Sequence, residues 1–226
     1  MQVLTRDSLP LGGFAGLTEY RLVTDIKLFG GRKIVNRFQG LGLFVYLADA
    51  CFNPKGETGM HPHREIDVIS VMVAGEIKHE GSLAHGTGLK VGDVQVQRAG
   101  GEGFSHNEVN PNRTKNRMIQ LWVLPENTGE PAGYKYYSPD SMGVTRIYGG
   151  NKQQNSIFDS HTCIDIVRLA ANSDMQFENE TLIYVTQGKV DFIEGDSIIS
   201  AEDGYLIRSK NVKINVINDV EFIVVS

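Results

Sequence analysis

The stretch "VMVAGEIKHEGS" (71–82) has the pattern of a strand, a glycine turn and a second strand. "IYVTQGKVDFIEGD" (183–196) repeats this pattern about 110 residues later. The repetition predicts an internal duplication. We expect the joint between the two copies in the polar segment 125–143, which is rich in Pro, Gly and Ser.

Short segments rich in Val, Ile, Phe and Tyr fill the rest of the chain, and 25 glycines punctuate them. No segment shows a sustained apolar period of 3.6 residues with caps at both ends, so we expect little helix. The fold class predicted is all-β, with two sandwich-like or barrel-like domains. The predicted strands are 42–49, 66–75, 76–81, 92–100, 117–125, 164–171, 181–188, 189–195, 204–209, 213–218 and 221–226.

Composition excludes several classes of partner. The chain has 226 residues and a formal net charge of −5, and its basic residues are scattered, so we expect no nucleic acid partner. No segment approaches the roughly 18 apolar residues of a membrane span, and the N-terminus lacks a signal peptide's apolar core. Cys51 and Cys163 lie far apart, which favours a reduced, cytoplasmic protein. No coiled coil argues for assembly, and we expect a monomer.

Two pairs of polar residues stand out against these strands. His61 and His63 in "GMHPHRE" are two residues apart, and side chains at that spacing share one face of a strand. His106 and Glu108 in "GFSHNEV" have the same spacing. If the two strands lie together, three imidazoles and one carboxylate converge, a set that suits a transition metal better than Ca or Mg. The alternative is that His61 and His63 are merely polar residues at a strand end.

The segment "HPHREIDVISVMVAGEIKHEGSLAHGTGLKVGDVQVQRAGGEGFSHNEVNP" (61–111) resembles the signature region of the pirin-like proteins, within the cupin superfamily. The likeness extends over about residues 40–137 and weakens elsewhere. It implies a bicupin, with two cupin-like β-barrels. The domains expected are a metal-binding one at 1–137 and a degenerate one without metal at 138–226.

The resemblance also implies a ligand set: His61, His63, His106 and Glu108. We expect one divalent transition metal, with iron first and Mn, Co, Ni, Cu or Zn as alternatives. Asp67 stands where the general cupin motif has an acidic ligand, and we expect it to stay back from the metal. His79, His85 and His161 are interpreted as non-ligands.

Some pirin-like proteins resemble quercetin 2,3-dioxygenases. The resemblance implies an O₂-dependent cleavage of flavonol-like aromatic substrates, with Glu108 as the catalytic proton acceptor. Apolar residues in "DVISVMV" and "VQVQ" are expected to wall a dry interior. Two alternatives stay open: a non-catalytic metal-binding regulator with protein partners, and another small-molecule reaction such as isomerisation.

Overall fold

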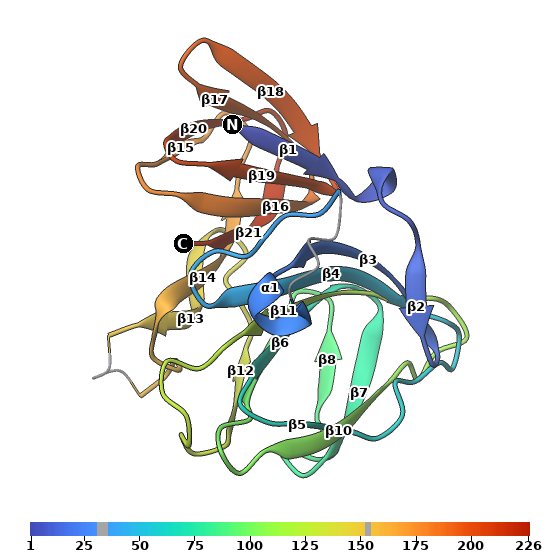
Figure 1. The fold of residues 1–226 in the computed structure, drawn as a ribbon. Helices are drawn as coiled ribbons and strands as arrows, with labels where there is room; N and C mark the ends of the chain where they lie inside the picture. The colour runs from blue at the N-terminus through green and yellow to red at the C-terminus, as the bar shows by residue number, and fades with distance from the viewer. Residues whose placement is uncertain (31–35, 152–154) are drawn as a thin grey trace. The chain divides into compact units, whose positions relative to one another are not determined.

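The computed structural model describes residues 1–30, 36–151 and 155–226, and within these ranges the chain is nearly all β (Figure 1). The helical segments described are α1 (Ile26–Phe29) and the 3₁₀ turn η1 (Arg6–Ser8). The prediction of an all-β protein with little helix is confirmed. Among the described residues there is no helix of the length and apolarity needed to cross a membrane.

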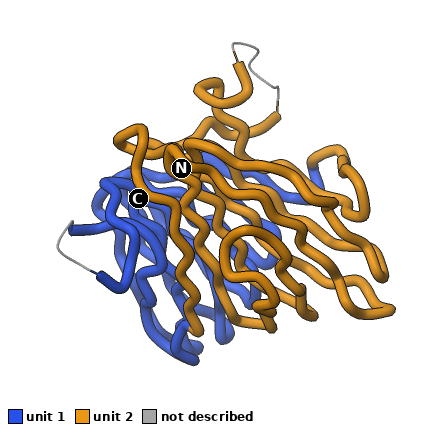
Figure 2. Tube along the Cα trace, turned by 90° about the horizontal axis from the view of Figure 1, so that it is seen from below, with its two compact units in different colours: residues 1–8, 139–226 blue, residues 9–138 orange. Residues whose placement is uncertain are grey.

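The chain divides into two compact units, coloured separately in Figure 2. We call Leu9–Ser138 (orange) the N-terminal unit, and Met1–Ser8 with Pro139–Ser226 (blue) the C-terminal unit. The expected domains began at residues 1 and 138. The structure differs because the first strand forms the edge of a sheet built from the second half of the chain.

The N-terminal unit contains two sheets, with strand orders β12-β9-β6-β11-β4-β3-β2 and β5-β10-β7-β8. Its large sheet is antiparallel throughout. The strand bounds are β2 (Gly12–Phe14), β3 (Leu17–Thr24), β4 (Phe44–Phe52), β5 (His61–His63), β6 (Asp67–Ala74), β7 (Glu76–Gly81), β8 (Gly88–Lys90), β9 (Val94–Arg98), β10 (Phe104–Val109), β11 (Arg117–Val123) and β12 (Gly133–Tyr137).

The C-terminal unit repeats this plan, with strand orders β1-β19-β16-β21-β14-β13 and β15-β20-β17-β18. Apart from β2, the two sets of orders correspond strand for strand, as expected of a duplication. The strand bounds are β1 (Gln2–Thr5), β13 (Gly143–Gly150), β14 (Ser160–Leu169), β15 (Asp174–Phe177), β16 (Thr181–Gln187), β17 (Lys189–Glu194), β18 (Ser197–Glu202), β19 (Tyr205–Ser209), β20 (Val212–Val216) and β21 (Val220–Val225).

Two cupin-like β-barrels were expected, and each unit is a pair of facing sheets of jelly-roll type that does not close into a full barrel. In the N-terminal unit Met72 and Met118 of the large sheet pack with Ile77 of the small one. In the C-terminal unit Phe222 packs with Phe192 in the same way. The hydrophobic core therefore lies between the two sheets of each unit, where apolar surface is removed from water.

Gly75 lies at a corner between the two sheets of the N-terminal unit. The strand, glycine turn and second strand predicted over 71–82 suggest a hairpin, but β6 belongs to the large sheet and β7 pairs with β10 and β8 in the small one. Gly75 has φ of +75°, a value that suits glycine, and the chain turns there from one layer to the other. Gly188, with φ of +84°, makes the same turn between β16 and β17.

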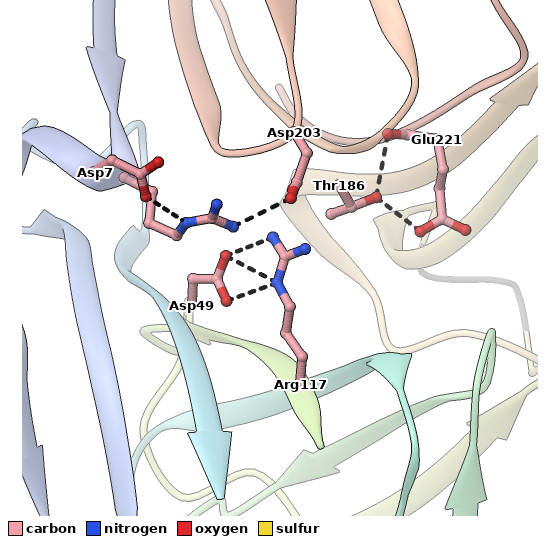
Figure 3. A network of polar contacts seen from close by, with 7 residues as sticks. Asp7, Asp49, Arg117, Thr186, Asp203 and Glu221 are labelled. Atoms are coloured by element: carbon pink, nitrogen blue, oxygen red, sulfur yellow. Dashed lines mark hydrogen bonds and ion pairs between the residues drawn. The ribbon is translucent and has the colours of Figure 1, made fainter. Parts of the chain in front are cut away.

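The predicted joint, 125–143, is less irregular than expected, because β12 falls inside it and pairs with β9. Polar contacts link neighbouring strands within each unit (Figure 3). In the N-terminal unit, Arg117 of β11 binds the carboxylate of Asp49 in β4 through Nε and Nη2, at 2.9 and 2.6 Å. In the C-terminal unit, Thr186 donates to the Glu221 carboxylate at 2.7 Å.

Candidate metal centre

The two strands that carry the histidines are neighbours in the small sheet of the N-terminal unit. β5 pairs antiparallel with β10, so that His61 lies opposite His106 and His63 opposite Phe104. Pro62, between the two histidines, is exposed and faces away. The two strands therefore pair with each other, as the metal hypothesis required.

The Nε2 atoms of three imidazoles converge at this point. Nε2 of His106 lies 3.0 Å from that of His61 and 3.2 Å from that of His63. The three residues form a group whose potential ligand atoms all lie within 4.8 Å of one another. Three nitrogens bound at right angles to one ion at about 2.1 Å would lie about 3.0 Å apart. The two distances from Nε2 of His106 thus match adjacent positions around a transition metal.

Hydrogen bonds decide which nitrogens are free to bind an ion. Nδ1 of His61 lies 2.8 Å from the carbonyl oxygen of Gly59, and Nδ1 of His106 lies 3.0 Å from Oε1 of Gln97. Both partners only accept, so both Nδ1 atoms carry the proton and both Nε2 atoms present a lone pair. Two lone pairs facing each other at 3.0 Å repel, and a cation between them removes the repulsion. The chemistry of the donor set therefore fits a metal ion.

The protonation of the histidines favours the same conclusion. Burial, with the neighbouring His61, lowers the pKa of His63 to about 4. Burial, with the three histidines around it, lowers the pKa of His106 to about 2. Both imidazoles are neutral at pH 7, which is the form that binds a metal.

Glu108 follows His106 on the same face of β10 and is fully buried. Its Oε1 accepts hydrogen bonds from Ser70 and Gln95, both at 2.9 Å, while its Oε2 has no hydrogen-bond partner among the described residues. Burial raises the pKa of Glu108 to about 7. The metal-binding group found in the described part of the chain consists of the three histidines, so Glu108 as a fourth ligand stays a prediction.

Asp67 forms an ion pair with Arg98, and its distance from the metal stays a prediction. Its Oδ2 accepts from Nε of Arg98 at 2.9 Å, and Arg98 also binds Glu130 at 3.0 Å. Asp67 and Arg98 are cross-strand neighbours on β6 and β9. A buried carboxylate needs such a partner, and this accounts for an acid at position 67 without a metal.

The polar side chains around the site were not predicted from the sequence. Gln95 and Gln97 are fully buried, although "VQVQ" was expected to wall a dry interior. The amide nitrogen of Gln97 lies 3.0 Å from Nε2 of His79, which turns its oxygen toward His106. The available signal was the presence of two glutamines at alternate positions in an otherwise apolar strand.

A cavity of about 130 Å³ adjoins the histidines. Its walls combine aromatic and polar side chains of the N-terminal unit: Phe14, Arg21, Phe29, Tyr46, Thr58, His61, His63, Gln120 and Trp122. Tyr46 and Trp122 stack with ring centroids 4.4 Å apart. The arrangement can accept a flat ligand beside the metal site.

The fold and the histidine cluster together define a cupin-like protein with a candidate metal centre. Residues 37–123 match the model of the family described as Pirin. The chain is 24% identical, over 68% of its length and 69% of the relative's, to a protein of Escherichia coli strain K12 named quercetin 2,3-dioxygenase. The resemblance of the motifs to the pirin-like proteins is therefore confirmed over residues 37–123.

Solved structures show the same fold. The bacterial pirin YhhW from Escherichia coli, in complex with nickel(II), is 19% identical and superimposes with a TM-score of 0.82 over 99% of this chain and 97% of that chain. A quercetin 2,3-dioxygenase from Acinetobacter baumannii is 21% identical, with a TM-score of 0.72 over 100% of this chain and 85% of that chain. At these identities the structural likeness shows the fold alone. The reaction has to be inferred from the residues of the site.

Proposed function

We propose that this protein is a metal-dependent dioxygenase that cleaves the ring of hydroxylated, flavonol-like aromatic substrates with O₂. The observation that carries the proposal is the convergence of three neutral imidazoles beside an aromatic-walled cavity. The relative named quercetin 2,3-dioxygenase supports the choice of reaction.

The ligands proposed are His61, His63 and His106, with Glu108 as the fourth. We propose iron as the native metal, with Mn, Co, Ni, Cu and Zn as alternatives. Nickel(II) is the ion bound by the bacterial pirin YhhW. When bound, the metal supplies Lewis acidity toward a substrate hydroxyl and redox chemistry toward O₂.

Glu108 is proposed as the proton acceptor for the substrate hydroxyl. Glu108 is buried on the strand that carries His106, and a general base must lie within hydrogen-bond reach of the proton that it takes. Ser70 and Gln95 hold Oε1 in place, which leaves Oε2 as the atom that takes the proton. The aromatic pair Tyr46 and Trp122 orients the ring and excludes water from it.

Metal content and O₂ uptake test the proposal together. Purified protein is expected to hold about one transition-metal ion per chain, and His106→Ala to hold almost none. His85→Ala is the matched control, because His85 is exposed and outside the cluster. Unchanged metal content in His106→Ala would remove the site from consideration.

An oxygen electrode then measures turnover with quercetin. The metal-loaded protein is expected to consume O₂ as quercetin is bleached, and Glu108→Gln to slow this at least about 100-fold while keeping its metal. No uptake with any of the six metals would overturn the dioxygenase proposal and favour a regulatory protein.

A further inference from the structure

The cavity beside the metal centre is too small for a whole flavonol. Its volume is about 130 Å³. An apolar protein cavity of about 150 Å³ holds one benzene molecule. A flavonol has three rings, so one ring at most enters this space and the remainder stays outside.

The walls of the cavity suit a single flat ring. Tyr46 and Trp122 stack on each other, and Phe29 of α1 lies 5.7 Å from Tyr46 and 6.5 Å from Trp122 between ring centroids. Three aromatic side chains from three elements therefore meet at one place. Such a cluster favours a planar ligand over a branched aliphatic one.

A row of cross-strand neighbours connects the metal centre to a guanidinium. Ser70 of β6, the hydrogen-bond partner of Glu108, lies opposite Gln120 of β11. Gln120 lies opposite Ala48 of β4, and Ala48 opposite Arg21 of β3. Cross-strand partners share one face of the sheet, and Ala48 has the small side chain in this row. The small side chain of Ala48 thus leaves space in the cavity between the polar residues at the two ends of the row.

The end of the row at Arg21 carries an excess of positive charge. Glu19 is buried and accepts hydrogen bonds from Tyr46 at 2.8 Å and from Arg21 at 2.6 Å. Arg37 interacts electrostatically with this group, and burial together with repulsion by Arg21 lowers its pKa. Two guanidinium groups face one carboxylate, because the Tyr46 hydroxyl stays neutral. One further negative charge would balance the cluster.

A second polar group in the cavity wall lacks a partner. Nε1 of Trp122 is buried and makes no hydrogen bond with the described residues. A buried donor without a partner loses free energy, and an acceptor oxygen on a ligand would restore it. This observation is independent of the charge on Arg21.

We propose that the cavity binds a monocyclic, hydroxylated aromatic carboxylate. Its carboxylate pairs with Arg21, its ring lies against Tyr46 and Trp122, and its hydroxyl points toward His61 and His63. This substrate class rests on the proposed function, because only a metal at the histidines makes the bound ring a substrate. Flavonols then act as surrogates that insert one ring.

A wider groove, which His63 also lines, is the competing site. It has a volume of about 310 Å³ and is lined by Pro62, Arg64, Glu102 and Ser105 among others. It contains neither the stacked aromatic pair nor Arg21. Ligands that bind in this groove would be insensitive to changes at Arg21, so one set of variants separates the two sites.

Trp122 is the only tryptophan of the chain, so its fluorescence reports directly on the cavity. Full-length protein, metal-free and metal-loaded, is titrated with benzoate, with its neutral analogue benzyl alcohol and with two-ring 2-naphthoate. Benzoate is expected to change the fluorescence of both forms and to bind about tenfold tighter than benzyl alcohol, the effect of one charge-assisted hydrogen bond. 2-Naphthoate is expected to bind more weakly than benzoate.

Two variants that are expected to change benzoate affinity in opposite directions make the test decisive. Arg21→Gln is expected to lose the roughly tenfold preference for benzoate, whereas Glu19→Gln, which frees Arg21 from its partner, is expected to tighten benzoate binding about tenfold. Arg113→Gln is the control, because Arg113 is exposed and distant in sequence from the cavity wall. Circular dichroism confirms folding of each variant.

Equal binding of benzoate and benzyl alcohol, or benzoate binding that ignores both Arg21→Gln and Glu19→Gln, would overturn the inference. Tighter binding of 2-naphthoate would overturn the size argument. Failure here is distinct from failure of the proposed function: the titration of metal-free protein reports on the cavity alone, while metal content and O₂ uptake report on the centre.

Discussion

The two units share a strand plan and differ in what their sheets enclose. In the N-terminal unit, strands β5 and β10 turn His61, His63 and His106 toward one point. In the C-terminal unit the corresponding strands β15 and β20 supply apolar side chains to the core: Met175, Phe177, Val212, Ile214 and Val216. The N-terminal unit has histidines on the strands where the C-terminal unit has apolar side chains that pack in the core.

The difference teaches that the histidines are not needed to build this fold. The same pair of sheets closes on an apolar interior in the C-terminal unit, where burial provides the stability. Burying three imidazoles and a carboxylate costs free energy unless hydrogen bonds or an ion compensate. The N-terminal unit accordingly surrounds its site with Gln95, Gln97 and Ser70.

The largest expected effect lies in the apolar interior of the C-terminal unit. Phe192 is fully buried in its core, and Phe192→Ala is expected to lower the free energy of unfolding by about 3–5 kcal/mol, because a large cavity remains. Urea unfolding followed by circular dichroism measures the change. A loss below about 1 kcal/mol would mean that stability does not reside in this core.

The matched change in the N-terminal unit is His63→Phe. The His63 ring makes its polar contact with Nε2 of His106 and none with the described backbone, so phenylalanine leaves no backbone group unpaired. The metal-free protein is expected to keep its unfolding free energy within about 1 kcal/mol while metal binding is lost. A loss of unfolding free energy as large as that of Phe192→Ala would show that His63 contributes as much to stability as the core of the C-terminal unit does.

The two corner glycines test whether both units turn between sheets in the same way. A Cβ at Gly188 would lie 2.1 Å from the carbonyl oxygen of Asp219, and one at Gly75 would lie 2.8 Å from Cβ of Asn116. Gly188→Ala is expected to cost about 2–4 kcal/mol of unfolding free energy, and Gly75→Ala somewhat less, because the close contact is 2.8 Å at Gly75 and 2.1 Å at Gly188.

Gly195→Ala is the control for these corners. Gly195 has a positive φ of +58° but nothing within 4 Å of the added Cβ, so only the backbone strain of about 1–2 kcal/mol applies. Equal losses for Gly195→Ala and Gly188→Ala in urea unfolding would show that contact with Asp219 is unimportant.

A smaller effect is expected from the glutamine that positions His106. Gln97→Leu removes the oxygen that accepts from Nδ1 of His106, so the imidazole loses its fixed tautomer. Metal affinity, measured by competition with a chelator, is expected to fall about 10–100-fold. Gln187→Leu, at the exposed end of β16, is expected to change nothing. Unaltered affinity in Gln97→Leu would contradict the assigned tautomer.

The smallest effect concerns the edge strands, β12 in one unit and β1 in the other. Burial raises the pKa of Tyr137, at the end of β12, to about 12. The folded state therefore holds this proton longer than the unfolded state, whose tyrosine titrates near pH ~10. Its contribution to stability is complete below about pH 10 and is lost as the pH rises through about 12.

The measurement compares wild type with Tyr137→Phe, which has no proton to lose. Between about pH 10 and about pH 12, the unfolding free energy of wild type is expected to fall relative to that of the variant. The slope of this fall against pH is expected to correspond to less than one proton. Parallel curves would mean that β12 frays from the sheet at high pH.

Much of the site was predictable because its parts are local. Residues two apart in a strand share a face, so the pairs at 61 and 63 and at 106 and 108 indicate their orientation from the sequence alone. The roles of Gln97 and Arg21 were not predictable. Each reaches the site through strand pairings between residues far apart in the chain, and the sequence contains no local signal of those pairings.

The sequence by itself determined strands such as β6, β11 and β21, the duplication and the chemical types of the proposed ligands, because backbone geometry imposes a short period that one segment displays alone. Tertiary structure decided the rest. The register of β5 on β10 brought the imidazoles together, the corner at Gly75 separated two strands that looked like a hairpin, and neighbours from β3, β4 and β11 shaped the cavity. These outcomes depend on lateral packing, which no single segment encodes.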